Sequence, residues 1–311
     1  MFENLWVEKY RPLKLVDLIL SPENRKFFED IKTKQEIPHL LLCGVQGSGK
    51  SSLAKITVRE LLDCQYLYIN ASSENGIDTM RNKISNFVST MSIDNKLKVV
   101  IFDEADFLTA GAQAGLRNIM EEFSDNSRFI LTGNYYNRLI GPIQSRCLQF
   151  ELIPPLDGCI KRCVSIIKAE DIKVENGQKE RLINLIKVNY PDLRSIINEL
   201  QKYSINGILN IPKDLHTSSS IVKDIFNKLN SQEDIIKIRK FIIENEILFV
   251  NDFHSLLKEL FEIFYKEENI DLNKKKRIML ILSEALFRHQ TVLDKEINCF
   301  ASLIEISEVL K

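Results

Sequence analysis

The feature that most constrains this sequence is a glycine-rich segment at residues 44–51, which reads GVQGSGKS. It fits the pattern G-x-x-x-x-G-K-[ST], whose glycines let the backbone wrap closely around an anion. The apolar run 40–43 predicts a buried parallel strand before the segment, and residues 51–56 predict the start of a helix after it. An ordinary glycine-rich turn does not need this context. The segment therefore predicts a phosphate-binding loop (P-loop) in an α/β fold with a parallel sheet.

The P-loop predicts that the chain binds a nucleoside triphosphate. Its backbone N–H groups would face the β-phosphate, and the N-terminus of the following helix would add the positive end of its dipole. Lys50 would supply a point charge. The hydroxyl of Ser51 would be a ligand for Mg²⁺.

A pair of acids follows a second apolar run. Residues 98–104 read KVVIFDE, which predicts a buried strand ending in Asp103 and Glu104. In P-loop enzymes such an aspartate holds the Mg²⁺ shell, and the neighbouring glutamate can polarise a water molecule. Helix capping would explain one carboxylate but not the pair, and Asp106 suits that capping role better. Residues 103–106 also spell DEAD, the tetrapeptide that names a helicase family, so a helicase is an alternative.

Length and composition narrow the class of protein. A chain of 311 residues, 44% hydrophobic and 27% charged, is typical of a globular protein with two or three domains. It has no apolar run of about eighteen residues and no signal-peptide pattern, so we expect a cytosolic protein without membrane contact. The net charge of −1 means that any DNA contact needs a local basic surface. Cys159 and Cys163 lie one helical turn apart, but two candidate ligands favour buried thiols over zinc.

The chain divides into three parts by pattern. Up to about residue 150, apolar strand patterns alternate with helical ones, which predicts a parallel sheet with covering helices. The expected strands are 40–43, 66–70, 99–102, 129–132 and 147–150. Helical patterns near 157–170, 178–188 and 192–204 predict a small helical domain, and the region beyond Pro212 contains no glycine or proline. We therefore expect an ATPase-type domain at 1–153, a helical lid at 154–213 and a C-terminal helical bundle at 214–311, with its phenylalanines, Phe249 among them, in a core or interface.

Three polar residues indicate which kind of P-loop protein this is. Asn134 follows the predicted strand 129–132, so it should lie at the same sheet edge as the P-loop and could position a water molecule. Arg146 precedes the last predicted strand and could reach a neighbouring subunit's γ-phosphate as an arginine finger. Arg194 begins a helix of the second domain. Taken alone, each has a simpler interpretation as a turn former or an exposed arginine.

These residues belong to a series of motifs that together carry a family resemblance. The series is WVEKYRP at 6–12, the P-loop, NASSENGID at 70–78, the acid pair, Asn134, SRC at 145–147 and PDLR at 191–194. From residue 5 to about 204 the chain resembles the AAA+ ATPase subunits of DNA-polymerase clamp loaders and is similar to replication factor C small subunits. The stretches 84–102 and 142–147 look closest to the ATPase subunit of tailed-phage clamp loaders.

The resemblance implies a role for each matching residue. It implies that ATP is held by Val7, Glu8, Lys9, Tyr10 and Ile19 around the adenine and by Gly47, Ser48, Gly49, Lys50, Ser51 and Ser52 around the phosphates. Ser51 and Asp103 would manage Mg²⁺, and Glu104 would be the catalytic base. Asn134 would be the first sensor of the nucleotide, Arg194 the second, and Arg146 the finger. Gln113 matches a position that couples neighbouring subunits, and Arg81 matches a region that tracks template-strand phosphates.

The resemblance also implies a function. Subunits of this kind load a sliding clamp onto primer-template DNA in replication, within a ring of several copies plus one different subunit, and the C-terminal bundle looks like the collar of that ring. The location would be the cytosol, the host cytoplasm for a virus, or the nucleus for a eukaryote. A helicase or helicase loader and a non-catalytic ring scaffold are the alternatives. Stimulation of ATP hydrolysis by clamp and primed DNA together would favour a loader. Strand unwinding would favour a helicase, and the absence of both activities would favour a scaffold.

Overall fold

A computed structural model describes residues 5–73, 77–89, 97–175, 177–204, 207–212, 218–245, 253–289 and 291–311. The chain forms two compact units, Met1–Ile211 and Pro212–Lys311. The expected boundary between residues 213 and 214 falls outside the described residues, as does part of the motif at 70–78. The expected boundary between residues 153 and 154 lies within the first unit and stays a prediction.

The first unit is built on one five-stranded sheet in which every pair is parallel. Its strands are β1 (Leu40–Cys43), β2 (Tyr66–Asn70), β3 (Lys98–Asp103), β4 (Ser127–Gly133) and β5 (Leu148–Glu151), in the order β2-β3-β4-β1-β5. The carboxyl ends of parallel strands meet at one edge of the sheet. The order therefore brings the P-loop after β1 next to the end of β4, and the end of β4 next to the end of β3.

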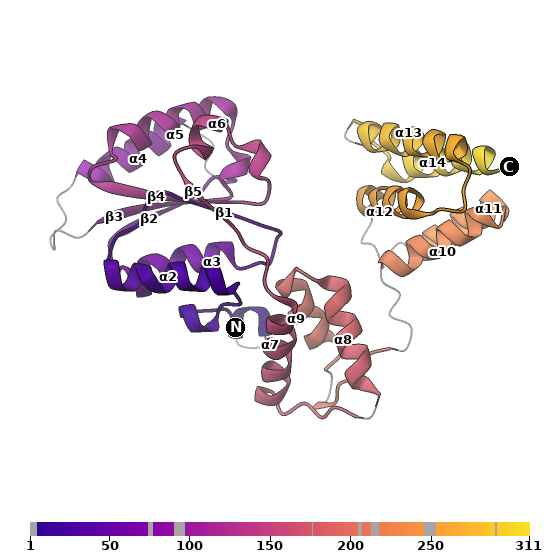
Figure 1. Ribbon diagram of the computed structural model, residues 1–311, viewed down its shortest axis with the longest axis horizontal. Coiled ribbons are helices and arrows are strands. Elements are labelled where there is room, and N and C mark those ends of the chain that lie inside the picture. Colours follow the sequence, from indigo (N-terminus) through magenta and orange to yellow (C-terminus); the bar gives the residue numbers. More distant parts are fainter. Residues whose placement is uncertain are drawn as a thin grey trace. The chain divides into compact units, whose positions relative to one another are not determined.

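Helices cover both faces of this sheet. Figure 1 shows α2 (Pro22–Lys34) and α3 (Lys50–Ile56) on one face and α4 (Ile77–Ser89), α5 (Ala110–Glu122) and α6 (Gly141–Gln144) on the other. Each face of the sheet has its own hydrophobic core, and successive side chains of β1 point into one core or the other. Leu40 and Leu42 pack toward α2 and α3, whereas Leu41 packs toward α5. Burial on both faces explains why the central strands β1, β3 and β4 are apolar runs, whereas the edge strands β2 and β5 are more exposed. The predicted α/β class is confirmed.

Short helical segments complete the first unit. They are η1 (Leu15–Asp17), η2 (Thr57–Leu61), which continues α3, η3 (Ala105–Phe107) and η4 (Tyr136–Arg138). The turn η3 follows β3 directly, and η4 begins three residues after β4 ends. Both turns therefore lie at the carboxyl edge of the sheet, the same edge as the P-loop.

Three helices of the first unit form the lid: α7 (Leu156–Ala169), α8 (Gln178–Asn189) and α9 (Leu193–Lys202). The short N-terminal helix α1 (Trp6–Lys9) is bonded to them, since the Trp6 N–H donates to Gln201 Oε1 of α9 at 3.0 Å. Cys159 and Cys163 are fully buried within α7. Burial raises the pKa of Cys159 to about 11 and that of Cys163 to about 12.

The second unit is a helical bundle, as predicted. Its helices are α10 (Ser218–Asn230), α11 (Ile235–Glu244), α12 (Phe253–Lys266), α13 (Leu272–Arg288) and α14 (Lys295–Leu310). Phe253 and Phe264 lie in its buried core, whereas Phe249 lies outside the described residues. Throughout the described part of the chain, none of the helices combines the length and the apolar character needed to span a bilayer.

Candidate nucleotide-binding and active site

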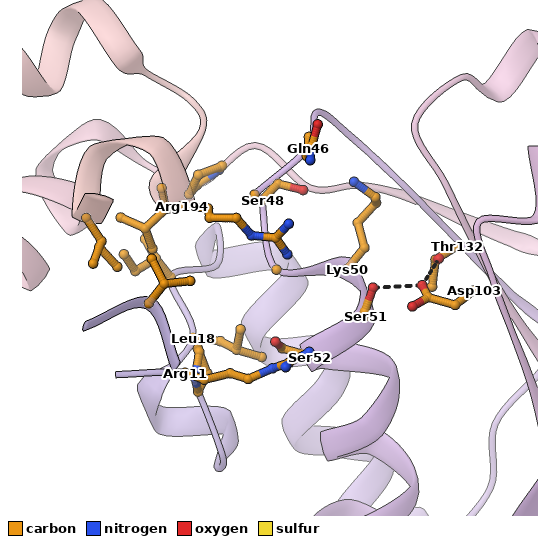
Figure 2. A pocket seen from close by; sticks show the side chains of 18 of the residues that line it. Arg11, Leu18, Gln46, Ser48, Lys50, Ser51, Ser52, Asp103, Thr132 and Arg194 are labelled. Carbon is orange, nitrogen blue, oxygen red and sulfur yellow. Dashed lines mark hydrogen bonds between the residues drawn. The ribbon is translucent and has the colours of Figure 1, made fainter. Parts of the chain in front are cut away.

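A pocket of about 370 Å³ lies at the carboxyl edge of the sheet. It is lined by the P-loop, the ends of β3 and β4, the N-terminal segment and the start of α9. Figure 2 shows these parts converging on the loop that carries Ser48 and Lys50. A site at this edge is where open α/β sheets bind their ligands. The predicted residues that line the pocket are Val7, Glu8, Tyr10, Ile19, Gly47, Ser48, Gly49, Lys50, Ser51, Ser52, Asp103, Glu104, Asn134 and Arg194.

Lys50 is buried at the first position of α3, directly after Gly49. Its Nζ donates to the carbonyl oxygens of Gly44 at 2.9 Å and Val45 at 2.8 Å. Burial lowers the pKa of Lys50, although the nearby carboxylates of Asp106 and Asp103 act in the opposite direction. The ammonium is thus held inside the loop, at the end of a helix that suits an anion.

Asp103 is the best-anchored acid of the site. Its Oδ1 accepts hydrogen bonds from the hydroxyls of Ser51, at 2.7 Å, and Thr132, and its Oδ2 accepts one from Tyr68 at 2.5 Å. Figure 2 shows the first two of these bonds. Burial raises the pKa of Asp103, but the three hydroxyl donors outweigh it and hold the pKa below its usual value. The carboxylate is therefore ionised at neutral pH.

The pair formed by Ser51 and Asp103 fits Mg²⁺. One hydroxyl and one carboxylate are hard oxygen donors, and Mg²⁺ in nucleotide sites binds one or two such groups together with phosphates and water. No group of three potential His, Cys, Asp or Glu ligands occurs among the described residues. The hydroxyl of Ser51 and the carboxylate of Asp103 are the donors expected of the protein where the nucleotide and water supply the remaining Mg²⁺ ligands.

Glu104 lies at the rim of the pocket in an unusual backbone conformation. Its φ of 58° and ψ of 41° place it in the left-handed region, and its N–H donates to Thr132 Oγ1 at 3.1 Å. A non-glycine residue in this region costs on the order of 1–3 kcal/mol and is typical of functional sites. The turn places Glu104 directly after β3, the strand that positions Asp103, where it lines the pocket.

The lid touches the P-loop at Gly47. This residue has φ of +75°, and a Cβ added there would lie 1.8 Å from Asp192 Oδ1 and 3.1 Å from the backbone nitrogen of Arg194. Asp192 itself caps α9, since its Oδ1 accepts from the Ser195 N–H at 3.0 Å. The cap therefore places the first turn of α9 against the loop, and Figure 2 shows Arg194 extending toward Ser48.

Gly47→Ala should disrupt this contact. Alanine meets both an unfavourable φ and the Asp192 carboxylate, so we expect a loss of roughly 1–3 kcal/mol in the free energy of unfolding and weaker nucleotide binding. Thermal unfolding and nucleotide titration measure the two effects. Gly111→Ala is the matched control, because a Cβ at this α5 position meets nothing within 4 Å. Equal behaviour of the two variants would contradict the contact.

The N-terminal segment lines the pocket through Val7, Glu8 and Tyr10, but not through Lys9. The Lys9 ammonium instead pairs with Glu170 at the end of α7, at 2.6 Å, and the Tyr10 hydroxyl donates to the same carboxylate at 2.5 Å. These two hydrogen bonds lower the pKa of Glu170. The structure thus brings Lys9 to the lid rather than to the pocket.

Three other predicted residues also lie outside the pocket. Arg146 follows α6, and its guanidinium contacts the Glu121 carboxylate and donates to the Pro142 carbonyl at 2.8 Å. Arg81 is exposed on α4. Gln113 is buried at the start of α5, where its amide bonds the backbone of Leu108, Arg138 and Ile140 at 2.8–3.0 Å. Gln113 therefore ties α5 to the segment between η4 and α6, which leads toward Arg146.

The structure corrects one prediction from the sequence. Asp106 does not cap the helix that follows it, because Thr109 is the N-cap of α5. Asp106 is instead buried within η3, and its Oδ2 accepts the backbone N–H groups of Asn134 and Tyr135, both at 3.2 Å. The partner lies 28 residues away in sequence, so no local pattern could identify it.

Several residues of the site were not predicted, and four of them are polar side chains that bind its other residues or line the pocket. Arg11 and Arg162 line the pocket, and Arg162 donates to the Tyr10 carbonyl at 2.8 Å. Thr132 and Tyr68 anchor Asp103. Only Thr132 carried a usable signal, because it is a polar residue within an otherwise apolar strand pattern, FILTG.

Comparison with known proteins identifies similar families and relatives. Residues 40–155 match the family described as "ATPase family associated with various cellular activities (AAA)", and residues 156–211 match "Sliding-clamp-loader large subunit, AAA+ ATPase lid domain". The chain is 34% identical to the replication factor C small subunit of Sulfurisphaera tokodaii over 87% of this chain and 93% of the relative. The protein of that name from Sulfolobus acidocaldarius is 32% identical over 82% and 87%, respectively. The one from Thermofilum pendens is 40% identical, but the match covers 66% of this chain and 64% of that relative's length.

Proposed function

This chain belongs to the replication factor C small subunit family, and from that premise we propose that it is an ATP-driven subunit of a clamp loader acting in DNA replication. The observation that carries the proposal is the pocket at the carboxyl edge of the sheet, where a P-loop lysine, an anchored aspartate, a glutamate and a lid arginine converge. Such a set suits phosphoryl transfer from a nucleoside triphosphate to water.

ATP is the proposed substrate. Its phosphates would lie along residues 47–52, and its adenine would lie beside Val7, Tyr10 and Ile19, which line the other part of the pocket. Bound Mg²⁺ would neutralise charge that develops on the β- and γ-phosphates. Ser51 and Asp103 would hold the metal, and the hydroxyls of Thr132 and Tyr68 would keep the carboxylate oriented.

Hydrolysis would use residues from three elements. Glu104 would accept a proton from the attacking water, and Asn134 would orient that water from the adjacent strand end. Arg194 would bind the nucleotide from α9, so that the lid responds to the nucleotide in the pocket. Arg146 does not line this pocket and pairs with Glu121, which suits a finger that stabilises charge on ATP in a neighbouring subunit.

The proposed partners are a sliding clamp, primer-template DNA and other loader subunits in a ring. Gln113 would couple neighbouring subunits and Arg81 would track the template strand, both on the strength of family resemblance. The resemblance to tailed-phage clamp loaders, and with it a viral source, stays a prediction, since the relatives reported above are archaeal. The DEAD tetrapeptide gives little support to a helicase, because Asp106 is bonded to the turn after β4 and the described residues form one sheet.

Glu104→Gln should separate binding from chemistry. The amide keeps the size of the side chain but does not accept a proton, so we expect ATP binding within a few-fold of wild type and turnover lowered by on the order of 10²–10⁴-fold. Nucleotide titration and single-turnover hydrolysis measure the two quantities. Turnover close to that of the unsubstituted chain would remove Glu104 from the role of base.

The loading function has a direct test. The chain is assembled with its partner subunits, and ATP hydrolysis is measured with clamp alone, with primed DNA alone and with both. We expect the strongest stimulation when both are present, and transfer of labelled clamp onto DNA that depends on ATP. Strand unwinding in place of transfer would identify a helicase, and hydrolysis that ignores both ligands would argue against a loader.

A further inference from the structure

Asp106 connects two turns that carry proposed catalytic residues. It is 5% exposed and lies in η3, two residues after Glu104. Its Oδ2 accepts the consecutive N–H groups of Asn134 and Tyr135, which follow the adjacent strand β4. One carboxylate oxygen therefore fixes the start of the turn that holds Asn134.

A second link joins the same two strand ends. Thr132 Oγ1 accepts the Glu104 N–H at 3.1 Å, while its hydroxyl donates to Asp103. Thr132 thus ties the end of β4 to the turn after β3, and Asp106 ties the turn after β3 to the end of β4. The two links run in opposite directions between neighbouring strands. Together they fix the spacing between Glu104 and Asn134.

Close packing leaves Asp106 little freedom. A Cβ built on Gly133 would lie 3.1 Å from Asp106 Oδ1 and 3.3 Å from its Cγ. This oxygen is buried and receives no hydrogen bond from the residues that the structure describes. The other oxygen, Oδ2, therefore carries the hydrogen bonds that hold the side chain in place.

We propose that Asp106 is a positioning residue that sets the geometry of Asn134 relative to Glu104 in ATP hydrolysis. The inference rests on the proposed function, since it assigns Asp106 a role in that same site. Asp106 acts through an acceptor oxygen and not through contact with ATP, because it is buried within η3 and does not line the pocket. A displacement of about 1 Å at a catalytic group can lower a rate by about a hundredfold.

A pair of substitutions at Asp106 tests the acceptor. Asp106→Ala removes it, and we expect single-turnover hydrolysis in the assembled complex to fall by roughly 10–100-fold with ATP affinity nearly unchanged. Asp106→Asn keeps an acceptor oxygen, so hydrolysis should stay within roughly threefold of wild type. Asp125→Ala, at an exposed position of the same unit, is the control. Equal losses in the alanine and asparagine variants would overturn the assignment in favour of a role for the charge.

A double-mutant cycle distinguishes positioning from general structural damage. If Asp106 acts through Asn134, Asp106→Ala should cost less than about threefold in an Asn134→Ala background. Loss of equal size in both backgrounds would overturn the proposal. If Asn134→Ala and Glu104→Gln themselves leave hydrolysis unchanged, the proposed function fails. If they lower hydrolysis while Asp106→Ala does not, this inference alone fails.

Gly133→Ala provides a second variant that leaves Asp106 in place. Its methyl group would press on the Asp106 carboxylate, while the backbone of Gly133 needs no positive φ. We expect a several-fold fall in hydrolysis that becomes smaller in an Asn134→Ala background. Unchanged hydrolysis in a folded Gly133→Ala protein, judged by thermal unfolding and ATP titration, would contradict the need for a fixed Asp106.

Discussion

Arg146→Ala should lower ATP turnover by about a thousandfold while ATP binding stays near that of the unsubstituted protein. The expected size comes from arginine fingers, which stabilise the charge of the transition state more than that of bound ATP. Within one chain the Arg146 guanidinium contacts Glu121 and does not line the pocket. An isolated monomer should therefore also bind ATP and hydrolyse it slowly. Binding by titration and turnover at saturating ATP check both expectations.

Mixing two inactive variants locates the catalytic event. Lys50→Ala keeps its finger and loses its P-loop cation, whereas Arg146→Ala keeps its P-loop and loses its finger. If Arg146 acts on the neighbouring subunit, mixed assemblies contain interfaces with an intact P-loop and an intact finger, so some turnover should return. Mass measurement confirms that mixed assemblies have formed. Confirmed mixtures without recovered turnover would leave Arg146 as a structural arginine paired with Glu121.

Lys50→Ala should weaken ATP binding by roughly a hundredfold, because a buried ammonium that would contact the phosphates is lost. Clamp loading should disappear with it. The substitution also removes the hydrogen bonds to Gly44 and Val45, so part of the loss would come from a looser loop. Nucleotide titration of the purified variant measures the effect.

Two further variants isolate the role of the charge. Lys50→Met retains most of the buried stem without the ammonium, and it should lose affinity to nearly the same extent. Lys34→Ala removes an exposed lysine from α2 of the same unit and should bind ATP normally. ATP affinity of Lys50→Met close to that of the unsubstituted chain would show that Lys50 acts through packing and not through its charge.

Local sequence patterns predicted the elements that carry the chemistry. All five predicted strands are present within a few residues of their expected bounds. The central three are apolar runs because they are buried on both faces of the sheet. The P-loop and the acids at 103–104 follow those runs directly, so the sheet edge could be located from the sequence alone. The lid helices were also predicted, from apolar residues at helical spacing.

Other features depend on contacts between segments that are distant in sequence. Asp106 looked like a helix cap, but its hydrogen-bond partners belong to the turn after β4. Lys9 sits inside a motif that implies an adenine contact, yet its ammonium pairs with Glu170, 161 residues away. Tyr68 reaches Asp103 because β2 and β3 are neighbours in the sheet.

The sequence by itself determined that this chain has a parallel sheet, a P-loop after its first strand and an acid pair at the end of its third strand. Those properties follow from residues that are close in sequence, where periodicity and backbone preferences act. Only the tertiary structure decided how the site is held: which hydroxyls orient Asp103, which carboxylate fixes the turn at Asn134, and how closely α9 approaches Gly47. Hydrogen bonds and close packing depend on distances in space, and the order of strands in the sheet sets those distances.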